Sequence, residues 1–317
     1  MSLITNGFKT ISSRGLLVFL SASLNYAKAM FFKKVRKERF IQHKVNNYKM
    51  LLDTTDPGIS RSLILFGTRE VDHKVILEEV LKPGITVFDI GANIGYYALM
   101  EKQLIGDKGK LIAIEPSPTN VKLLKRNLLL NGYKENEIAV VQCGVSNKAA
   151  EMDFHLAQQA NLHTFHPKGS AARDLTGEII KVKTYTIPDL VETHGAPGLI
   201  RMDVEGHELE IISGMLNDIE ADKYKPMICF EPHLSCYTAD HDFAPVLERL
   251  FKNGYKTPYL SSNAQSGTDR IKSYGYQPSS LIKSDGETKA IFENIKPDDV
   301  IKILTETGGA RTVLLAP

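Results

Sequence analysis

The chain contains few cysteines and almost no net charge, and both deficits exclude classes of protein. Its three cysteines, Cys143, Cys229 and Cys236, show neither metal-site spacing nor a disulfide framework. Two of them lie in apolar runs, so we interpret the cysteines as free thiols of a reducing compartment. A formal net charge of +2 over 317 residues provides no overall field that would attract nucleic acid, and we expect no such partner.

Long apolar runs and phosphate-binding motifs are also missing. No run approaches the ~20 apolar residues of a membrane span, and no segment has the form Gly-x-x-x-x-Gly-Lys. The short apolar run 15–24 outlines a signal peptide, with Ala27-Lys28-Ala29 in the place of a cleavage site. Because Lys28 interrupts that site and five basic residues follow it closely, we favour a retained helix in a cytoplasmic protein.

Positive charge is concentrated at the N-terminus. Residues 1–50 hold ten lysines and arginines and a single acidic residue. Apolar residues also recur there at helical spacing, namely Leu16, Leu20, Leu24, Ala27 and Phe31. We therefore expect a basic amphipathic extension over residues 1–45 that packs on the rest of the protein or contacts an anionic membrane surface. The alternative is a solvated helix face without a partner.

From about residue 84 onward, apolar runs alternate with helical patterns, which predicts a parallel sheet flanked by helices. Near-continuous apolar strands are expected when both faces of a sheet are covered. We predict an α/β domain with a Rossmann-like fold over residues 46–317, with cap elements at 46–80 and the core at 84–260. The runs are Thr86–Ile90, Leu111–Ile114, Ile138–Cys143, Leu199–Met202 and Met227–Phe230.

Three segments outside these runs carry weaker patterns. In the cap we expect a strand pair, Tyr48–Leu52 and Leu63–Phe66, and a helix near Asp72–Leu81. Residues 155–178 show no clear periodicity, and we interpret them as a long surface loop over the active site.

The first motif that carries chemistry ends the first core strand. It runs from Asp89 to Gly95 as Asp-Ile-Gly-Ala-Asn-Ile-Gly and opens a helical segment. Glycines there permit a tight turn and close approach of a ligand to the backbone. Asp89 would lie at the carboxyl end of the strand, where ligands bind in such sheets, and could hold the ammonium of a methionine moiety. Glu115 ends the next strand and could accept both hydroxyls of a ribose.

A dinucleotide is the rival cofactor for such a loop. Its fingerprint requires glycines at 91, 93 and 96, whereas the chain has Gly91, Asn93 and Tyr96. Without those glycines a pyrophosphate cannot approach the start of the helix. The pattern therefore favours an adenosyl cofactor without phosphates, S-adenosylmethionine.

Ionisable residues follow the fourth and fifth predicted strands. Asp203 and Glu205 end the fourth, and Glu231 and His233 end the fifth. Four such groups converging on one edge would be costly without a purpose, so we predict that they are catalytic. The alternative is a set of acids at a helix start, where the macrodipole favours negative charge.

Two routes could remove the acceptor's proton at this edge. Asp203 or His233 could take it directly as the methyl group arrives. Alternatively, the carboxylates could hold a divalent cation that lowers the acceptor's pKa. We favour the metal-free route and predict no metal ligand, because a cation would repel the positive sulfonium and the sequence shows no complete ligand set.

These motifs together closely resemble the FkbM family of methyltransferases over about residues 67–235. The resemblance implies a seven-stranded Rossmann-like methyltransferase fold and O-methylation of polyketide or sugar hydroxyls. It implies that Glu115 binds the ribose and that Glu70 lies near the methionine end. The predicted cofactor residues are Glu70, Asp89, Gly91, Ala92, Asn93, Gly95, Tyr96, Glu115, Pro116, Ser117, Gly144, Val145, Ser146 and Asp203, with 144–146 on the adenine side.

The sequence leaves the acceptor open between a small molecule, a lipid and a sugar. An N-methyltransferase, or one acting on a macromolecule, is the alternative if the basic extension binds an anionic polymer. A cofactor-binding module without catalysis is the non-enzymatic alternative. Neither the oligomeric state nor the role of the tail after residue 260 follows from the sequence.

Overall fold

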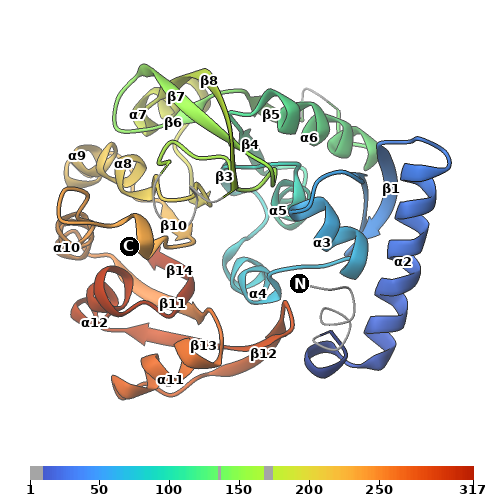
Figure 1. Cartoon of the computed structure of the whole chain (residues 1–317). Coiled ribbons are helices and arrows are strands. Elements are labelled where there is room, and N and C mark those ends of the chain that lie inside the picture. Colours follow the sequence, from blue (N-terminus) through green and yellow to red (C-terminus); the bar gives the residue numbers. More distant parts are fainter. Residues whose placement is uncertain (1–9, 135–136, 168–173) are drawn as a thin grey trace.

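A nine-stranded sheet forms the centre of the molecule in the computed structural model, which describes residues 10–134, 137–167 and 174–317 (Figure 1). Five adjacent parallel strands lie in the order β10-β9-β3-β4-β5. All five lie where apolar runs predicted them, so the Rossmann-like fold is confirmed. Their bounds are Met227–Phe230 for β10, Leu199–Met202 for β9, Thr86–Ile90 for β3, Lys110–Ile114 for β4 and Ile138–Val141 for β5.

The tail of the chain completes and extends this sheet. β14 (Ala310–Ala316) lies between β10 and β11 (Lys256–Ser262), antiparallel to both. These two strands complete the seven that the resemblance implies. The antiparallel pair β12 (Ser280–Ser284) and β13 (Glu287–Ile295) adds two more strands beyond β11. The tail after residue 260 is therefore part of the main sheet.

Helices cover both faces of the sheet, and alternate strand residues face opposite ways. In β3, Val87 packs into one buried cluster, whereas Phe88 and Ile90 pack into the other. This two-sided burial is why the strands are near-continuous apolar runs. One face is covered by α4 (Val71–Val80), which confirms the predicted helix there, α5 (Tyr96–Ile105) and α6 (Pro118–Leu130). The other is covered by α7 (Ile187–His194), α8 (Glu208–Ser213), α9 (Leu216–Glu220), α10 (Ala244–Lys252), α11 (Gln265–Ser273), α12 (Pro297–Lys302) and η3 (Ile303–Thr307).

The predicted strand pair in the cap is half wrong. β2 (Tyr48–Asp53) pairs with β1 (Phe40–Val45) instead of with residues 63–66. The latter lie in helix α3 (Ile59–Phe66). An apolar run of four residues cannot distinguish a strand from one turn of a buried helix, and here the helix forms. The boundary predicted at residue 45 falls in the turn of the β1–β2 hairpin.

The N-terminal helix forms as predicted, but with a different face inward. In α2 (Leu16–Lys34), which lies beside α3 at the edge of the molecule, Ala22 and Ala29 are the buried residues (Figure 1). The predicted apolar stripe points outward, and Leu24 is 73% exposed. Small alanines two turns apart let the two helix backbones approach each other, which larger residues would prevent. None of the helices in the described ranges is both long and apolar enough to span a bilayer.

A second, three-stranded sheet replaces part of the predicted loop 155–178. It contains β6 (Gly144–Val145), β7 (Ala150–Ala157) and β8 (Leu175–Tyr185) in the order β6-β8-β7. The loop prediction is wrong at both ends, where β7 ends and β8 begins. The sequence did not reveal β8 because most of its residues are exposed or half-buried and give only a faint apolar pattern. Residues 168–173 of that prediction lie outside the described residues.

Candidate active site

The loop after β3 packs against the ends of the neighbouring strands. The Gly91 amide donates to the Ile114 carbonyl of β4 over 2.9 Å. Gly91 has a φ of 76°, and a Cβ there would lie 2.3 Å from the Asp203 carbonyl oxygen. Gly95 has a φ of 90°, and a Cβ there would lie 2.7 Å from the Leu124 side chain. Both glycines are therefore required by contacts within the protein, and ligand contact at this loop stays a prediction.

Glu115 is fixed at the end of β4 by three donors. One carboxylate oxygen accepts the Asn93 amide over 2.9 Å, and the other accepts the Ser117 amide over 2.9 Å and the Asn120 side chain over 3.3 Å. Burial raises the pKa of Glu115 to about 7 despite these bonds. Among the described residues, no cation pairs with the carboxylate that these bonds orient.

A cavity with about 500 Å³ of empty space, part of it open to solvent, lies over the carboxyl ends of β3, β4 and β9. The segment after β7 contributes Asn161, His163 and Phe165 to its wall, which confirms that part of the predicted loop covers this edge. The predicted residues that line it are Gly91, Asn93, Glu115, Pro116, Gly144, Val145, Asp203 and Glu205.

A second, narrower cavity adjoins the first. Both are lined by Gly91, Asn93, Asn161 and Asp203, and we call the two cavities together the crevice. The second cavity also brings in the predicted residues Glu70, Ala92 and Tyr96. Asp203 lies at the junction of the two cavities.

Asp89 lies behind the crevice instead of in its wall. Its side chain is fully buried, and one carboxylate oxygen lies 3.2 Å from the Arg201 guanidinium. Arg201 also reaches Asp203 over 3.3 Å and lies 4.1 Å above the Tyr97 ring. The structure thus does not support direct contact between Asp89 and a methionine ammonium. Arg201, for which the sequence predicted no role, is the cation that contacts both acids.

Two further predicted residues support the crevice without lining it. Ser117 caps helix α6 by accepting the Asn120 amide. The Ser146 hydroxyl lies 3.0 Å from Nε2 of His207, a residue that does line the first cavity.

Glu205 and His233 form the core of the predicted catalytic edge. Burial raises the pKa of Glu205 to about 8, opposed by His233, whose Nε2 lies 3.4 Å from the Glu205 carboxylate. The other ring nitrogen of His233 lies 2.8 Å from Glu208. Burial would lower the His233 pKa, but Glu208 and Glu205 raise it well above its usual range. These two carboxylates favour the protonated form of His233 and so oppose its predicted role as the base.

This edge also has a ligand set that the sequence did not reveal. One ligand atom each from Asp203, Glu205 and His233 lie within 4.8 Å of one another. A divalent ion could bridge such a set only if His233 gave up its proton.

Glu70 and Glu231 are joined by a cation from the tail. Arg311, on β14, lies 2.7 Å from Glu70 and also pairs with Glu231. Glu70 receives a second guanidinium from Arg69 and a 2.6 Å bond from the Tyr97 hydroxyl. Burial would raise the pKa of Glu70, but Arg69 and Arg311 hold it well below its usual range. Sequence reasoning missed Arg311 because nothing in the tail indicated that β14 reaches this edge.

A third cavity opens beside Glu70, next to the second cavity. It shares Arg69, Glu70 and Asn161 with the second cavity. The rest of its wall is polar and comes from distant segments, including Arg14, Ser62, Asn263, Asp285, Lys289 and Arg311. A polar mouth of this kind suits a hydroxylated ligand.

Comparison with known families identifies related sequences. The sequence model of the methyltransferase FkbM domain matches residues 89–257, more than half of the chain. The model of protein-L-isoaspartate(D-aspartate) O-methyltransferase matches residues 24–150.

Individual relatives are distant. The hexuronic acid methyltransferase AglP of Haloferax volcanii is 26% identical over 152 residues, which cover 47% of this chain and 56% of that protein. The 31-O-demethyl-FK506 methyltransferase FkbM of Streptomyces tacrolimicus is 28% identical over 163 residues, covering 43% and 61%. A solved structure of methyltransferase FkbM from Methylobacillus flagellatus KT has 18% identity and a TM-score of 0.35, covering 73% and 52%. The chain spans little more than half the length of the curated relatives it matches.

Proposed function

The chain belongs to the FkbM methyltransferase family, and from this premise we propose that it transfers the methyl group of S-adenosylmethionine to a hydroxyl oxygen of a sugar or another small molecule. The observation that carries the proposal is the crevice between Glu115 and Asp203 at the carboxyl edge of the sheet. Two relatives are named for such acceptors, a hexuronic acid and a demethylated FK506.

The residues of the crevice fit this cofactor. Glu115 would accept the ribose hydroxyls, and the backbone at Gly144 and Val145 would line the adenine side. Glu70 would lie at the methionine end, in the second cavity. When bound, the cofactor supplies an electrophilic methyl group on a sulfonium. The protein's own task is then to align the acceptor and to remove its proton.

We assign the proton transfer to Asp203 or Glu205. These two acids line the crevice, whereas Glu231 and His233 do not. A carboxylate is a poor base for a hydroxyl unless its pKa is raised, and Glu205 has a pKa of about 8. The imidazolium of His233 would stabilise Glu205 after it ionises. We retain the metal-free route because a divalent ion would repel the positive sulfonium of the cofactor.

The exposed face of α2 supports a second proposal, contact of a cytoplasmic protein with an anionic membrane surface. Leu17 is 83% and Leu24 is 73% exposed on this helix, and Lys33 and Lys34 end it. Apolar side chains can enter the headgroup region while the lysines attract anionic lipids.

The experiment for the proposed activity is turnover on an acceptor panel. Purified chain would be incubated with S-adenosylmethionine and with uronic acids, neutral sugars, hydroxylated polyketides, lipids and peptides. We expect adenosylhomocysteine to form only with hydroxylated acceptors, with the methyl group on oxygen. Methylation of amines or of peptides alone would refute the acceptor class. Tight NAD binding without binding of S-adenosylmethionine would refute the cofactor.

A further inference from the structure

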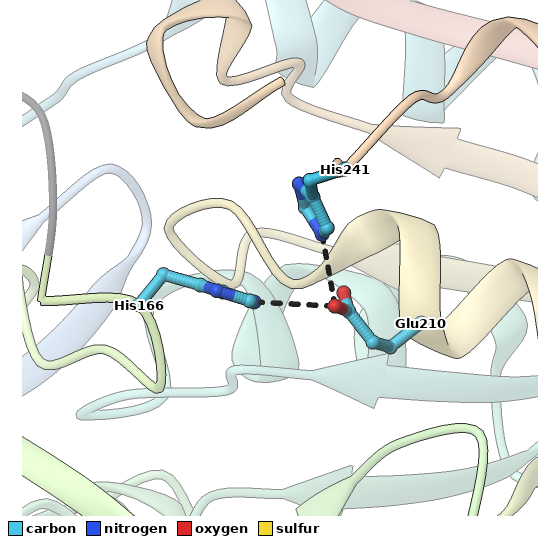
Figure 2. Close-up of side chains that lie close together, drawn as sticks. All are labelled: His166, Glu210 and His241. Atoms are coloured by element: carbon cyan, nitrogen blue, oxygen red, sulfur yellow. Dashed lines mark hydrogen bonds and ion pairs between the residues drawn. The ribbon is translucent and has the colours of Figure 1, made fainter. Parts of the chain in front are cut away.

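A second group of metal-ligating side chains lies outside the proposed methyl-transfer edge. His166 follows β7, Glu210 lies in α8, and His241 lies between η2 (Leu234–Cys236) and α10. Figure 2 shows the three side chains pointing toward one another from these separate segments. One ligand atom from each lies within 4.8 Å of the other two.

The distances are close to those around a zinc ion. Nε2 of His241 lies 2.8 Å from one Glu210 carboxylate oxygen, and Nε2 of His166 lies 3.5 Å from the same oxygen (Figure 2). In a tetrahedral site with metal–ligand distances of about 2.0–2.1 Å, neighbouring ligand atoms are roughly 3.3 Å apart. The third pair of ligand atoms, on His166 and His241, lies within 4.8 Å, so the two histidines would draw closer together around an ion.

A hydrogen bond to the second ring nitrogen of His241 orients this side chain as metal-binding histidines are oriented. Nδ1 of His241 lies 2.8 Å from the Cys236 carbonyl oxygen, which can only accept, so Nδ1 carries the proton and Nε2 faces Glu210. Metal-binding histidines commonly donate their other nitrogen to a backbone carbonyl in this way. The second Glu210 oxygen is buried and accepts no hydrogen bond, which leaves it able to contribute to an ion.

His207 connects this group to the first cavity. Its Nδ1 lies 2.8 Å from Nε2 of His166, and its ring lines the cavity. An ion bound to Nε2 of His166 would displace the contact between His166 and His207. Occupancy of the ion site would thereby change a hydrogen bond in the cavity wall.

We propose that His166, Glu210 and His241 bind a zinc ion, with water in the fourth position. Two imidazoles and one carboxylate suit zinc better than magnesium or calcium, which prefer oxygen ligands alone. The ion fastens the segment that carries His163 and Phe165 to α8 and to the residues before α10. Its role is therefore to hold the cavity wall in place, and the proposal is independent of methyl transfer.

The test measures zinc content and thermal stability of the full chain. After loading with zinc and dialysis, we expect about one zinc per wild-type chain by elemental analysis, and a higher melting temperature with zinc than after chelation. Glu210→Gln and His241→Ala should each lower the retained zinc at least tenfold and abolish the zinc-dependent shift. The control His43→Ala, on β1, should retain both.

Two outcomes of the zinc measurement would contradict the proposed site. Zinc retained equally by wild type and both variants, or by none of them, would show that these residues form an ion pair only. Zinc lost in His233→Ala but kept in His241→Ala would place the ion at the Asp203 edge and overturn the proposal. Because Glu210→Gln keeps the shape of the side chain, it supplies the comparison if His241→Ala fails to fold.

Discussion

Buried carboxylates in this protein differ in how far their partners offset the effect of burial on the pKa. Burial alone would raise the pKa of every one of them. Cationic neighbours nevertheless hold the pKa of Glu70 and of Glu208 below the usual range. Glu115 and Glu205 remain at about 7 and about 8. Both of these side chains line the first cavity. The carboxyls with a raised pKa therefore lie where the cofactor and the acceptor are proposed to bind.

Substitution of Glu115 tests its proposed contact with the ribose of the cofactor. Replacing it with alanine removes the acceptor for ribose hydroxyls, and charge-assisted bonds of this kind contribute about 1.5–3 kcal/mol each. We expect Glu115→Ala to weaken binding of S-adenosylmethionine by at least about 10-fold in calorimetry. Glu192→Gln, an exposed carboxylate on α7, is the control and should bind as wild type does. Unchanged affinity in Glu115→Ala would refute the ribose assignment.

The pH dependence of turnover follows from Glu205. Its pKa of about 8 means that it carries a proton at neutral pH and becomes a base only above that value. We expect kcat to rise with pH up to about 8 and then to level off. Glu205→Gln should remove this rise and lower kcat at pH 9 by about 100-fold or more, as expected for the loss of a general base. A wild-type pH profile in Glu205→Gln would transfer the role to Asp203.

Stability of the same variant separates catalysis from folding. The folded pKa of about 8 lies above the unfolded value of about 4.3. Between these values only the folded state holds the proton, so wild-type stability falls as pH rises through this window. Glu205→Gln stays neutral and should therefore be at least as stable as wild type at pH 9 in thermal unfolding. Inactivity in a more stable protein cannot result from unfolding.

At the scale of elements, the sequence identified the five parallel strands of the core and missed other strands and a helix. The five parallel strands were predictable because burial on both faces makes their residues continuously apolar. β8 and α3 were not, because a half-exposed strand and a four-residue apolar run carry ambiguous periodicity. Glu115 and Asp203 were predicted at strand ends and do line the crevice. His166 and His241 converge only through loop folding, which leaves no spacing signal in the sequence.

Helix α2 provides the prediction at the element scale. Each lysine near an anionic leaflet contributes about 1 kcal/mol, so Lys33→Gln with Lys34→Gln should weaken binding to phosphatidylserine vesicles about 30-fold at low salt. Leu17→Ser with Leu24→Ser should weaken it at low and high salt alike. Leu281→Ser removes an equally exposed leucine from β12 and serves as the control in vesicle sedimentation. Equal sedimentation of all variants, or equal binding to neutral vesicles, would exclude this membrane contact.

At the scale of the whole molecule, one ion-pair cluster ties distant parts of the chain together. Glu70 lies at the start of α4 in the cap, Glu231 ends β10 in the core, and Arg311 lies on β14 in the tail. The cap and the tail therefore meet at Glu70, in the wall of the second cavity. If the methionine end of the cofactor binds there as proposed, a segment that the family resemblance does not cover contributes to its site.

Arg311→Gln tests this coupling. The Arg311 side chain is 27% exposed, so its loss should cost between the ~1 kcal/mol of an exposed pair and the ~3–5 kcal/mol of a fully buried one. Glu70 keeps Arg69 after the change, whereas Glu231 loses its closest cation and should take up a proton at neutral pH. We therefore expect Arg311→Gln to be less stable than wild type in urea unfolding at pH 7, with a smaller loss of stability at pH 5. We also expect it to bind S-adenosylmethionine more weakly.

The control is Arg249→Gln, which breaks an exposed pair with Glu220 and should change stability little. If Arg311→Gln behaved like Arg249→Gln in both assays, Arg311 would contribute neither to stability nor to cofactor binding. The proposed role of the tail in the site would then be refuted.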